Sequence, residues 1–199
     1  MGIFGPSLKE VWAQLSEEIN GDFTEGGIFS VPKVIVNKDY WAILLDTYTV
    51  STGKTSATYT RFRAAFLKNQ DIYFKIYKEG IFSDLAKMLG MQDIEIGIED
   101  FDNNFVIKGN NEESIKNILS ITEVRNLIQA QDRINLEIKE SGGFLGPKYP
   151  EDVAILEFTG SGVIKDIETL KSIFKLFEVI LNRMADLEII QRKNPNVEL

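Results

Sequence analysis

Four segments rich in β-branched and aromatic residues follow one another between residues 31 and 77. They cover residues 31–36, 40–50, 57–67 and 72–77. The intervening residues are Asn37-Lys38-Asp39, Ser51-Thr52-Gly53-Lys54 and Asn69-Gln70-Asp71, which are turn formers at hairpin spacing. This pattern predicts an antiparallel meander, in which consecutive strands are neighbours in the sheet.

Helix signals flank this strand-rich region. Ser7 and Glu10 form a capping-box pattern that predicts a helix start, and Asn20-Gly21 predicts its end. Alternating isoleucines at 94, 96 and 98 indicate a strand. Short helices are predicted after Asn110 or Asn111 and after Thr122, and a further one from Ser83 to Met88. Two more strands are expected at residues 133–139 and 153–158.

A long helix is predicted near the C-terminus, over about residues 163–190. Its apolar stripe is wider than a single contact needs: Ile167, Leu170, Ile173, Phe174, Leu176, Phe177, Ile180, Leu181, Met184 and Leu187. We therefore expect this helix to pack on the sheet and also against the first helix or a second subunit. The predicted fold is one α+β domain over residues 1–192, with an antiparallel meander sheet, short helices and this long helix packed on the sheet. Residues 193–199 are expected to form a frayed polar tail.

The chain has 199 residues, no histidine, no cysteine and a formal charge of −8. These two absences exclude a Ser-His-Asp triad, a thiolate nucleophile and a cysteine-ligated zinc site. The net negative charge argues against a role of the protein in binding long nucleic acid, because such binding needs a cationic surface. Neither a secretory signal nor a membrane-spanning apolar stretch is recognisable, so a cytoplasmic protein that does not insert into a membrane is expected.

Two glycine-containing segments partly match phosphate-binding motifs. Gly53-Lys54-Thr55 lacks the glycine that a P-loop needs five residues earlier, where Tyr48 stands, and a strand follows it instead of a helix. Gly160-Ser161-Gly162 does lie between a strand and a helix, but Lys165 occupies the place of the third glycine in a dinucleotide fingerprint. A phosphate site at residues 160–162 stays open as the less favoured interpretation.

Acidic residues concentrate at 93–102, where five carboxylates occur without a basic residue. The pattern from Asp100 to Asn104 begins like a calcium loop but fails at Phe105 and Asn111, which replace the required Gly and Glu. A magnesium or manganese site built from Asp93, Glu95, Asp100 and Asp102 is one interpretation, since Asp93 and Glu95 would share a strand face. An exposed polar strand face is the favoured one.

The most distinctive constellation is a predicted aromatic and cationic face. Tyr59, Arg61 and Arg63 alternate along one strand, and Tyr73, Lys75 and Tyr77 alternate along the next. If these two strands form a hairpin, the six side chains lie together. Three interpretations stand: an ordinary solvated face, internal pairing with the acidic segment 93–102, or a face that binds an acidic peptide, a phosphorylated ligand or single-stranded nucleic acid.

Several runs resemble an uncharacterised family of bacterial cytosolic proteins. They include Phe4-Gly5-Pro6-Ser7, the segment from Leu45 to Lys54, Gly90-Met91-Gln92-Asp93, and the segment from Phe105 to Asn110. Residues 101–119 are also similar to part of a broader set of membrane-anchored bacterial proteins of unknown function. The resemblance implies a bacterial, cytosolic protein, and it implies no activity or functional residue.

These observations favour a non-enzymatic binding or interaction domain that works without a cofactor. We expect it to self-associate through residues 164–187 and to bind an acidic protein or a small anionic ligand through the aromatic and cationic face. The alternative hypothesis is a hydrolase or transferase that uses Mg²⁺ or Mn²⁺ held by the carboxylates of residues 93–102.

Overall fold

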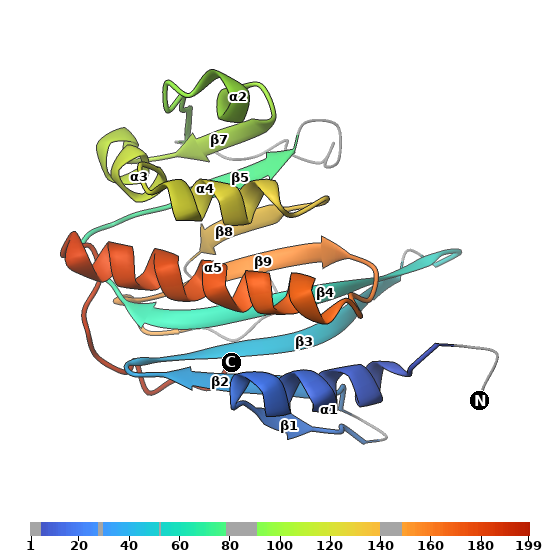
Figure 1. Cartoon of the computed structure of the whole chain (residues 1–199). Coiled ribbons are helices and arrows are strands. Elements are labelled where there is room, and N and C mark those ends of the chain that lie inside the picture. Colours follow the sequence, from blue (N-terminus) through green and yellow to red (C-terminus); the bar gives the residue numbers. More distant parts are fainter. Residues whose placement is uncertain (1–4, 28–29, 52, 79–90, 140–148) are drawn as a thin grey trace.

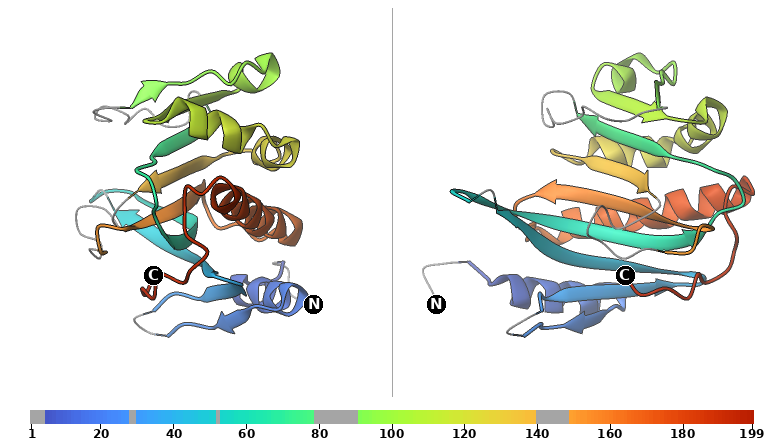
Figure 2. Two further views of the ribbon diagram at one scale, coloured as in Figure 1. Left: turned by 90° about the vertical axis from the view of Figure 1, so that its left-hand side faces the viewer. Right: turned by 180° about the vertical axis from the view of Figure 1, so that it is seen from behind.

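The computed structural model describes residues 5–27, 30–51, 53–78, 91–139 and 149–199. Its elements are α1 (Leu8–Ile19), β1 (Asp22–Thr24), β2 (Lys33–Lys38), β3 (Trp41–Ser51), β4 (Ser56–Leu67), β5 (Phe74–Lys78), β6 (Gln92–Asp93), α2 (Glu99–Asp102), β7 (Phe105–Gly109), α3 (Glu112–Leu119), α4 (Thr122–Gln129), β8 (Asn135–Lys139), β9 (Val153–Ser161) and α5 (Ile167–Asp186). The strands form one antiparallel sheet, and α1, α3, α4 and α5 lie on one side of it (Figures 1 and 2). The predicted α+β fold with a long C-terminal helix on the sheet is confirmed.

The ends of α1 and the start of α3 follow the local signals of the sequence, whereas Thr122 is the first residue of α4 and Ile121 is its N-cap. The Ser7 hydroxyl accepts a hydrogen bond from the Glu10 N–H at 3.3 Å, and the Ser7 N–H donates to the Glu10 carboxylate at 2.7 Å. Asn20 ends α1 in the left-handed conformation, with φ of 53°. Asn111 rather than Asn110 caps α3, because its side chain accepts from the Ser114 N–H. The predicted capping box is therefore confirmed, and the choice left open at residues 110–111 is resolved.

The order of strands departs from a simple meander at one point. The sheet runs β1-β2-β3-β4-β9-β8-β5-β7-β6, so the expected neighbours β2, β3 and β4 do pair in sequence. The expected hairpin between β4 and β5 is wrong, because β4 pairs with β9 and β5 pairs with β8 and β7. The turn residues after β4 predict only that the chain turns there. They do not predict that a strand formed by residues between 135 and 161 will pair with β4.

The core lies between the sheet and the helices. Phe62 on β4 is fully buried, with ring centroids of Phe158, Phe174 and Phe177 at 5.9, 4.9 and 6.0 Å. Alternate residues of β4 point to the opposite side of the sheet. We call that side, on which no helix of the described residues lies, the open face.

Helix α5 lies along the middle of the helix-covered face (Figure 1). It contacts α1 on one side and α3 and α4 on the other. Its wide apolar stripe is therefore used inside the chain, and this accounts for the width that suggested a second subunit. Self-association through residues 164–187 stays a prediction. No helix of the described ranges is both long and apolar enough to span a bilayer.

The last residues of the chain return to the open face. Val197 and Leu199 pack with Tyr149 against a small cluster formed by Ala65, Leu67 and Val153. The Tyr149 hydroxyl also donates a hydrogen bond to the Glu198 carbonyl at 3.3 Å. The segment expected to be a frayed tail thus contacts the sheet. The helix predicted at residues 83–88 lies outside the described residues.

Candidate functional site

A row of charged side chains crosses the open face of the sheet. It runs over five adjacent strands and consists of Asp46 on β3, Arg61 and Arg63 on β4, Glu157 on β9, Glu137 and Lys139 on β8, and Lys75 on β5. We call this set the charged row. Acidic and basic groups alternate across the strands, so the row is held together by internal ion pairs.

Asp46 is a buried carboxylate of the charged row that binds two arginines. Its carboxylate accepts from Arg61 Nε at 2.8 Å and Nη2 at 2.7 Å, and from Arg63 Nη2 at 2.8 Å. Asp46 and Arg63 are both buried, while Arg61 is partly exposed. Burial by itself lowers the pKa of Arg61, but the Asp46 hydrogen bond and charge, with Glu157, raise it above the ordinary value. The two arginines are thus fixed as cations around one carboxylate.

The other end of the charged row is formed by lysines and glutamates. Lys139 Nζ lies 2.6 Å from Glu157 and 3.9 Å from Glu137, and Lys75 Nζ lies 3.5 Å from Glu137. Register explains these contacts, because Glu137 is the cross-strand partner of both Lys75 and Glu157. Glu137 and Glu157 therefore lie directly opposite each other, and the neighbouring Lys75 and Lys139 reduce the repulsion between the two carboxylates.

The structure separates the predicted aromatic and cationic face into two parts. Tyr59, Arg61 and Arg63 do share one side of β4, and Lys75 shares the open face from β5. Two intervening strands, β9 and β8, lie between these groups. Tyr77 lies on β5 and is buried, and Tyr73 precedes β5, with its hydroxyl 3.2 Å from Lys68 Nζ. The six side chains therefore do not form one contiguous patch.

Internal pairing does occur, but with other acids than expected. Arg61 and Arg63 bind Asp46, and Lys75 binds Glu137. Within the acidic segment 93–102, Asp93 pairs with Lys108 at 3.0 Å, a contact that raises the pKa of Lys108. A lone carboxylate inside the apolar strand 40–50 is the signal that could have identified Asp46 from sequence.

Tyr48, Tyr59 and Arg61 stack where the β3–β4 ribbon leaves the body of the sheet. The two tyrosine rings are 5.3 Å apart with an interplanar angle of 20°, and the Arg61 guanidinium lies 5.0 Å from the Tyr48 ring centroid. Burial raises the pKa of the Tyr48 hydroxyl, against a hydrogen bond to Thr159 that lowers it. This part of the predicted face keeps both its aromatic and its cationic character.

The four carboxylates of the predicted metal site have separate roles. Asp102 accepts from the backbone N–H groups of residues 96, 97 and 98 at 3.0, 2.9 and 3.0 Å. Asp100 accepts from Gln129 Nε2 at 2.8 Å, and Asp93 is paired as described above. The strand predicted across residues 93–98 is wrong, since β6 ends at Asp93 and the following backbone turns around Asp102. Glu95 is exposed, and no group of three acidic side chains in the described residues could hold a metal ion.

Among the described residues, no strand pairs with the outer edge of β3 along half its length. Pairing with β2 ends at Val34 and Leu45, whereas β3 continues to Ser51. The Gly162 N–H donates to the Thr58 carbonyl, so Thr58 directs its backbone away from β3. Its cross-strand partner Thr49 then directs its own backbone outward, away from β4. By the same alternation the outward positions are Thr47, Thr49 and Ser51, and we call residues 46–51 the β3 edge.

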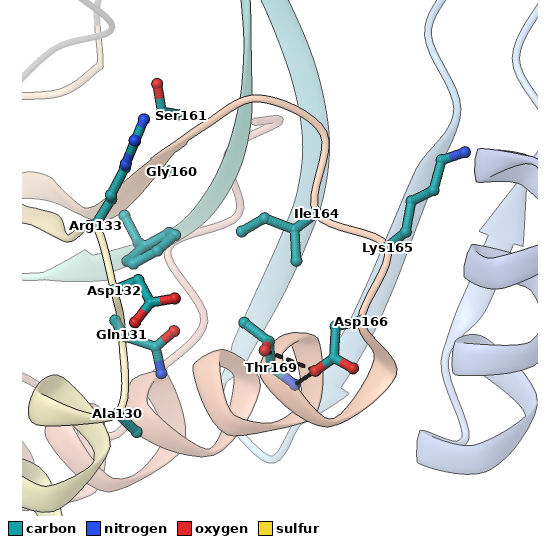
Figure 3. A pocket seen from close by; sticks show the side chains of 11 residues that line it. Ala130, Gln131, Asp132, Arg133, Gly160, Ser161, Ile164, Lys165, Asp166 and Thr169 are labelled. Carbon is teal, nitrogen blue, oxygen red and sulfur yellow. Dashed lines mark hydrogen bonds between the residues drawn. The ribbon is translucent and has the colours of Figure 1, made fainter.

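A cavity of about 370 Å³ opens on the helix side, between the end of β9, the start of α5 and the α4–β8 connection (Figure 3). Gln131, Asp132 and Arg133 lie on one side of it and Ile164 lies across from them, and Phe158 and Gly160 also line it. The Gly160-Ser161-Gly162 segment lies beside it, as the phosphate interpretation requires. Asp166, however, already caps α5 by accepting from the Thr169 N–H at 2.8 Å.

Comparisons with known proteins define a fold and no family. No family model matches the chain, and no curated protein matches it. Among solved structures, the crystal structure of the mycobacterial trehalose monomycolate transport factor A, TtfA, is similar, with a TM-score of 0.53. The sequence identity is 7%, and the match covers 96% of this chain and 98% of that one. The two chains share an overall fold.

Proposed function

We propose that this protein is a non-enzymatic interaction domain that binds an extended segment of another protein along the β3 edge. The observation that carries the proposal is the unpaired backbone of Thr47, Thr49 and Ser51, beyond the last pair of β2 with β3. A strand added there would continue the sheet in the position that β2 vacates. The alternating outward groups would supply its hydrogen bonds.

The composition of the β3 edge supports this proposal. Asp46, whose carboxylate is bound by Arg61 and Arg63, is the one charged residue of the β3 edge, and none occurs from Thr47 to Gly53. Proteins commonly protect a strand edge with charges, proline or a covering element, because an unprotected edge pairs with other chains. Pro32 immediately precedes β2, at the point where β2 would have to extend to lie beside this part of β3, and it has no N–H to donate there.

Side chains next to the β3 edge would determine which residue types are favoured in a bound strand. Tyr48 lies on the open face, held by the Tyr59 ring and the Arg61 guanidinium, and Val50 is 45% exposed. Because Tyr48 is already ordered by these contacts, packing a partner residue on it loses little side-chain entropy. Aromatic and β-branched residues are favourable cross-strand partners of tyrosine and valine. We expect a segment rich in such residues to bind.

A displayed library of linear peptides, selected against the full chain, tests the proposal. Thr49→Pro removes an outward N–H that no strand uses, so the fold is expected to persist while peptide binding is lost. Thr49→Val is the matched control, since it keeps the N–H and the shape but removes the hydroxyl that contacts Thr58 at 2.9 Å. Peptides should bind the wild type and the valine variant, and they should slow amide hydrogen exchange at Thr49 and Ser51.

Three results would overturn this assignment. They are a selection that yields no binding peptide, binding that Thr49→Pro leaves unchanged, and exchange protection located elsewhere. If the protein forms a concentration-dependent dimer and Thr49→Pro dissociates it, the β3 edge binds a second copy of the chain instead of another protein. Self-association through residues 164–187 is a separate proposal, and a sedimentation experiment at micromolar concentration that shows only monomer would reject it.

A further inference from the structure

The polar side of the cavity beside the start of α5 includes the Gln131 carbonyl, an acceptor that receives no hydrogen bond from the described residues. Gln131 is 97% buried, since only 3% of its surface is exposed, and its Nε2 donates to the Leu127 carbonyl and to the Ser172 hydroxyl, both at 3.0 Å. These two donations fix the orientation of the amide. Its carbonyl oxygen then points into the cavity, as Figure 3 shows, and accepts no hydrogen bond from the described residues.

Two charged side chains flank this carbonyl. Asp132 and Arg133 follow Gln131 in the α4–β8 connection, and both are exposed. Neither takes part in an ion pair or a side-chain hydrogen bond in the part of the chain that the structure describes. In Figure 3 Arg133 extends along the mouth of the cavity toward Ser161, and the Asp132 carboxylate lies close to Gln131. This contrasts with the charged row, where each cation has an acidic partner.

The cavity also has an apolar part. Phe158, which lines the cavity, is buried, and Ile164 projects into the cavity from the loop that precedes α5. Lys165, which also borders the cavity, turns away and donates to the Pro6 carbonyl at 3.1 Å. A ligand that fills the site therefore meets the Arg133 guanidinium, acceptor oxygens that include those of Gln131, Asp132 and Asp166, and the apolar side chains of Phe158 and Ile164.

We propose that this cavity binds a free α-amino acid with an apolar side chain. Arg133 would hold the carboxylate through its planar pair of N–H donors. The Asp132 carboxylate and the Gln131 carbonyl would accept from the ammonium group, which is a donor only. The side chain would pack on Phe158 and Ile164. A volume of about 370 Å³ is at the small end of ligand pockets, which suits a single small molecule.

The charge balance of the cavity selects this class over a phosphate. The Asp166 carboxylate occupies the α5 N-terminus, where it accepts from both the N–H and the hydroxyl of Thr169. Asp132 adds a second negative charge to the cavity wall. A phosphate dianion would be repelled by these two carboxylates. An amino-acid zwitterion, in contrast, can place its negative carboxylate at Arg133 and its positive ammonium group at Asp132.

Calorimetric titration of the full chain with free leucine, phenylalanine and methionine tests the proposal. The matched probes for leucine are isoamylamine, which lacks the carboxylate, and 4-methylpentanoate, which lacks the ammonium. At least one amino acid is expected to bind and to raise the melting temperature. Its two truncated analogues are expected to bind at least about tenfold more weakly, because each leaves one charged contact unmade.

Variants of the two unpaired residues complete the test. Arg133→Gln and Asp132→Asn should each weaken amino-acid binding at least about tenfold without changing the melting temperature of the unliganded protein. Lys54→Gln, at the exposed end of the β3–β4 ribbon, is the control and should bind as the wild type does. Amide shifts in NMR spectra should change around Gln131 and Thr169.

The assignment is wrong if none of the three amino acids binds, if an analogue binds as tightly as its amino acid, or if Arg133→Gln binds unchanged. Spectral changes confined to another part of the molecule would also overturn it. The β3 edge lies on a different element and its test uses Thr49, so the outcome here is independent of the proposed peptide binding.

Discussion

Removing the Asp46 carboxylate should be among the most destabilising single changes on the open face. Asp46→Ala deletes three hydrogen bonds from Arg61 and Arg63. The Asp46 and Arg63 side chains are only 9% and 10% exposed, so Arg63 is left as a buried cation without its acidic partner. Its Nε already lacks a hydrogen bond, which makes rearrangement inside the sheet more difficult.

The magnitude follows from this geometry. Breaking a buried ion pair by removing one partner costs about 3–5 kcal/mol. Arg61 is 24% exposed and can recover part of its hydration, so we expect the lower end, about 3 kcal/mol. For a chain of this length that corresponds to a decrease of roughly 6–12 °C in melting temperature. Urea denaturation followed by circular dichroism measures the change.

A surface pair provides the control for this experiment. Lys9 and Glu25 are 2.8 Å apart, yet their side chains are 51% and 67% exposed, so Glu25→Ala should cost less than about 1 kcal/mol. In an Arg63→Met background, Asp46→Ala should cost about 1–3 kcal/mol less than in the wild type, because the buried cation is then absent. Equal costs for Asp46→Ala and Glu25→Ala would refute the reasoning, as would a double mutant in which the two effects simply add.

Three further predictions concern other elements. Asp166→Ala should destabilise α5 by about 1 kcal/mol at neutral pH, because it removes the N-cap of the helix. The hydrogen bonds from Thr169 lower the pKa of Asp166, so the difference in stability from the wild type should persist above about pH 4 and disappear as the pH falls through the lowered pKa. Unfolding curves measured from about pH 7 to about pH 2 test this. Gly109→Ala should cost about 1–3 kcal/mol in urea denaturation, since its Cβ would lie 2.2 Å from a core isoleucine methyl and 3.0 Å from a backbone oxygen, whereas Gly5→Ala, with nothing within 4 Å, should be neutral. Tyr48→Phe should remove one tyrosine that ionises above its ordinary pKa of about 10 in an ultraviolet titration, because burial raises that pKa.

Local chemistry in the sequence was a reliable guide where one element or one turn decides the structure. The capping box at Ser7 and the alternation of Phe62 with Arg61 and Arg63 both hold in the structure. The pairing of β4 with β9 could not be predicted in this way, because it joins Arg61 to Thr159, nearly a hundred residues later. Such pairings depend on which long-range contacts bury the most apolar surface, and a turn motif does not encode that.

The acidic segment 93–102 shows why carboxylates in a sequence are weak evidence for a metal. Three consecutive backbone N–H groups converge on Asp102, so the energy that a cation would gain there is already supplied by the chain. A carboxylate that accepts hydrogen bonds from the backbone of a turn and one that holds a metal are the same residue in the sequence, and only the position of the backbone donors distinguishes them.

The presence or absence of partners within the chain also distinguishes the two groups of cations on this protein. Arg61 and Arg63 are engaged by Asp46, while Arg133 has no acidic partner in the described residues and lies at a cavity beside the Gln131 carbonyl, so a ligand would add contacts there that the fold does not provide.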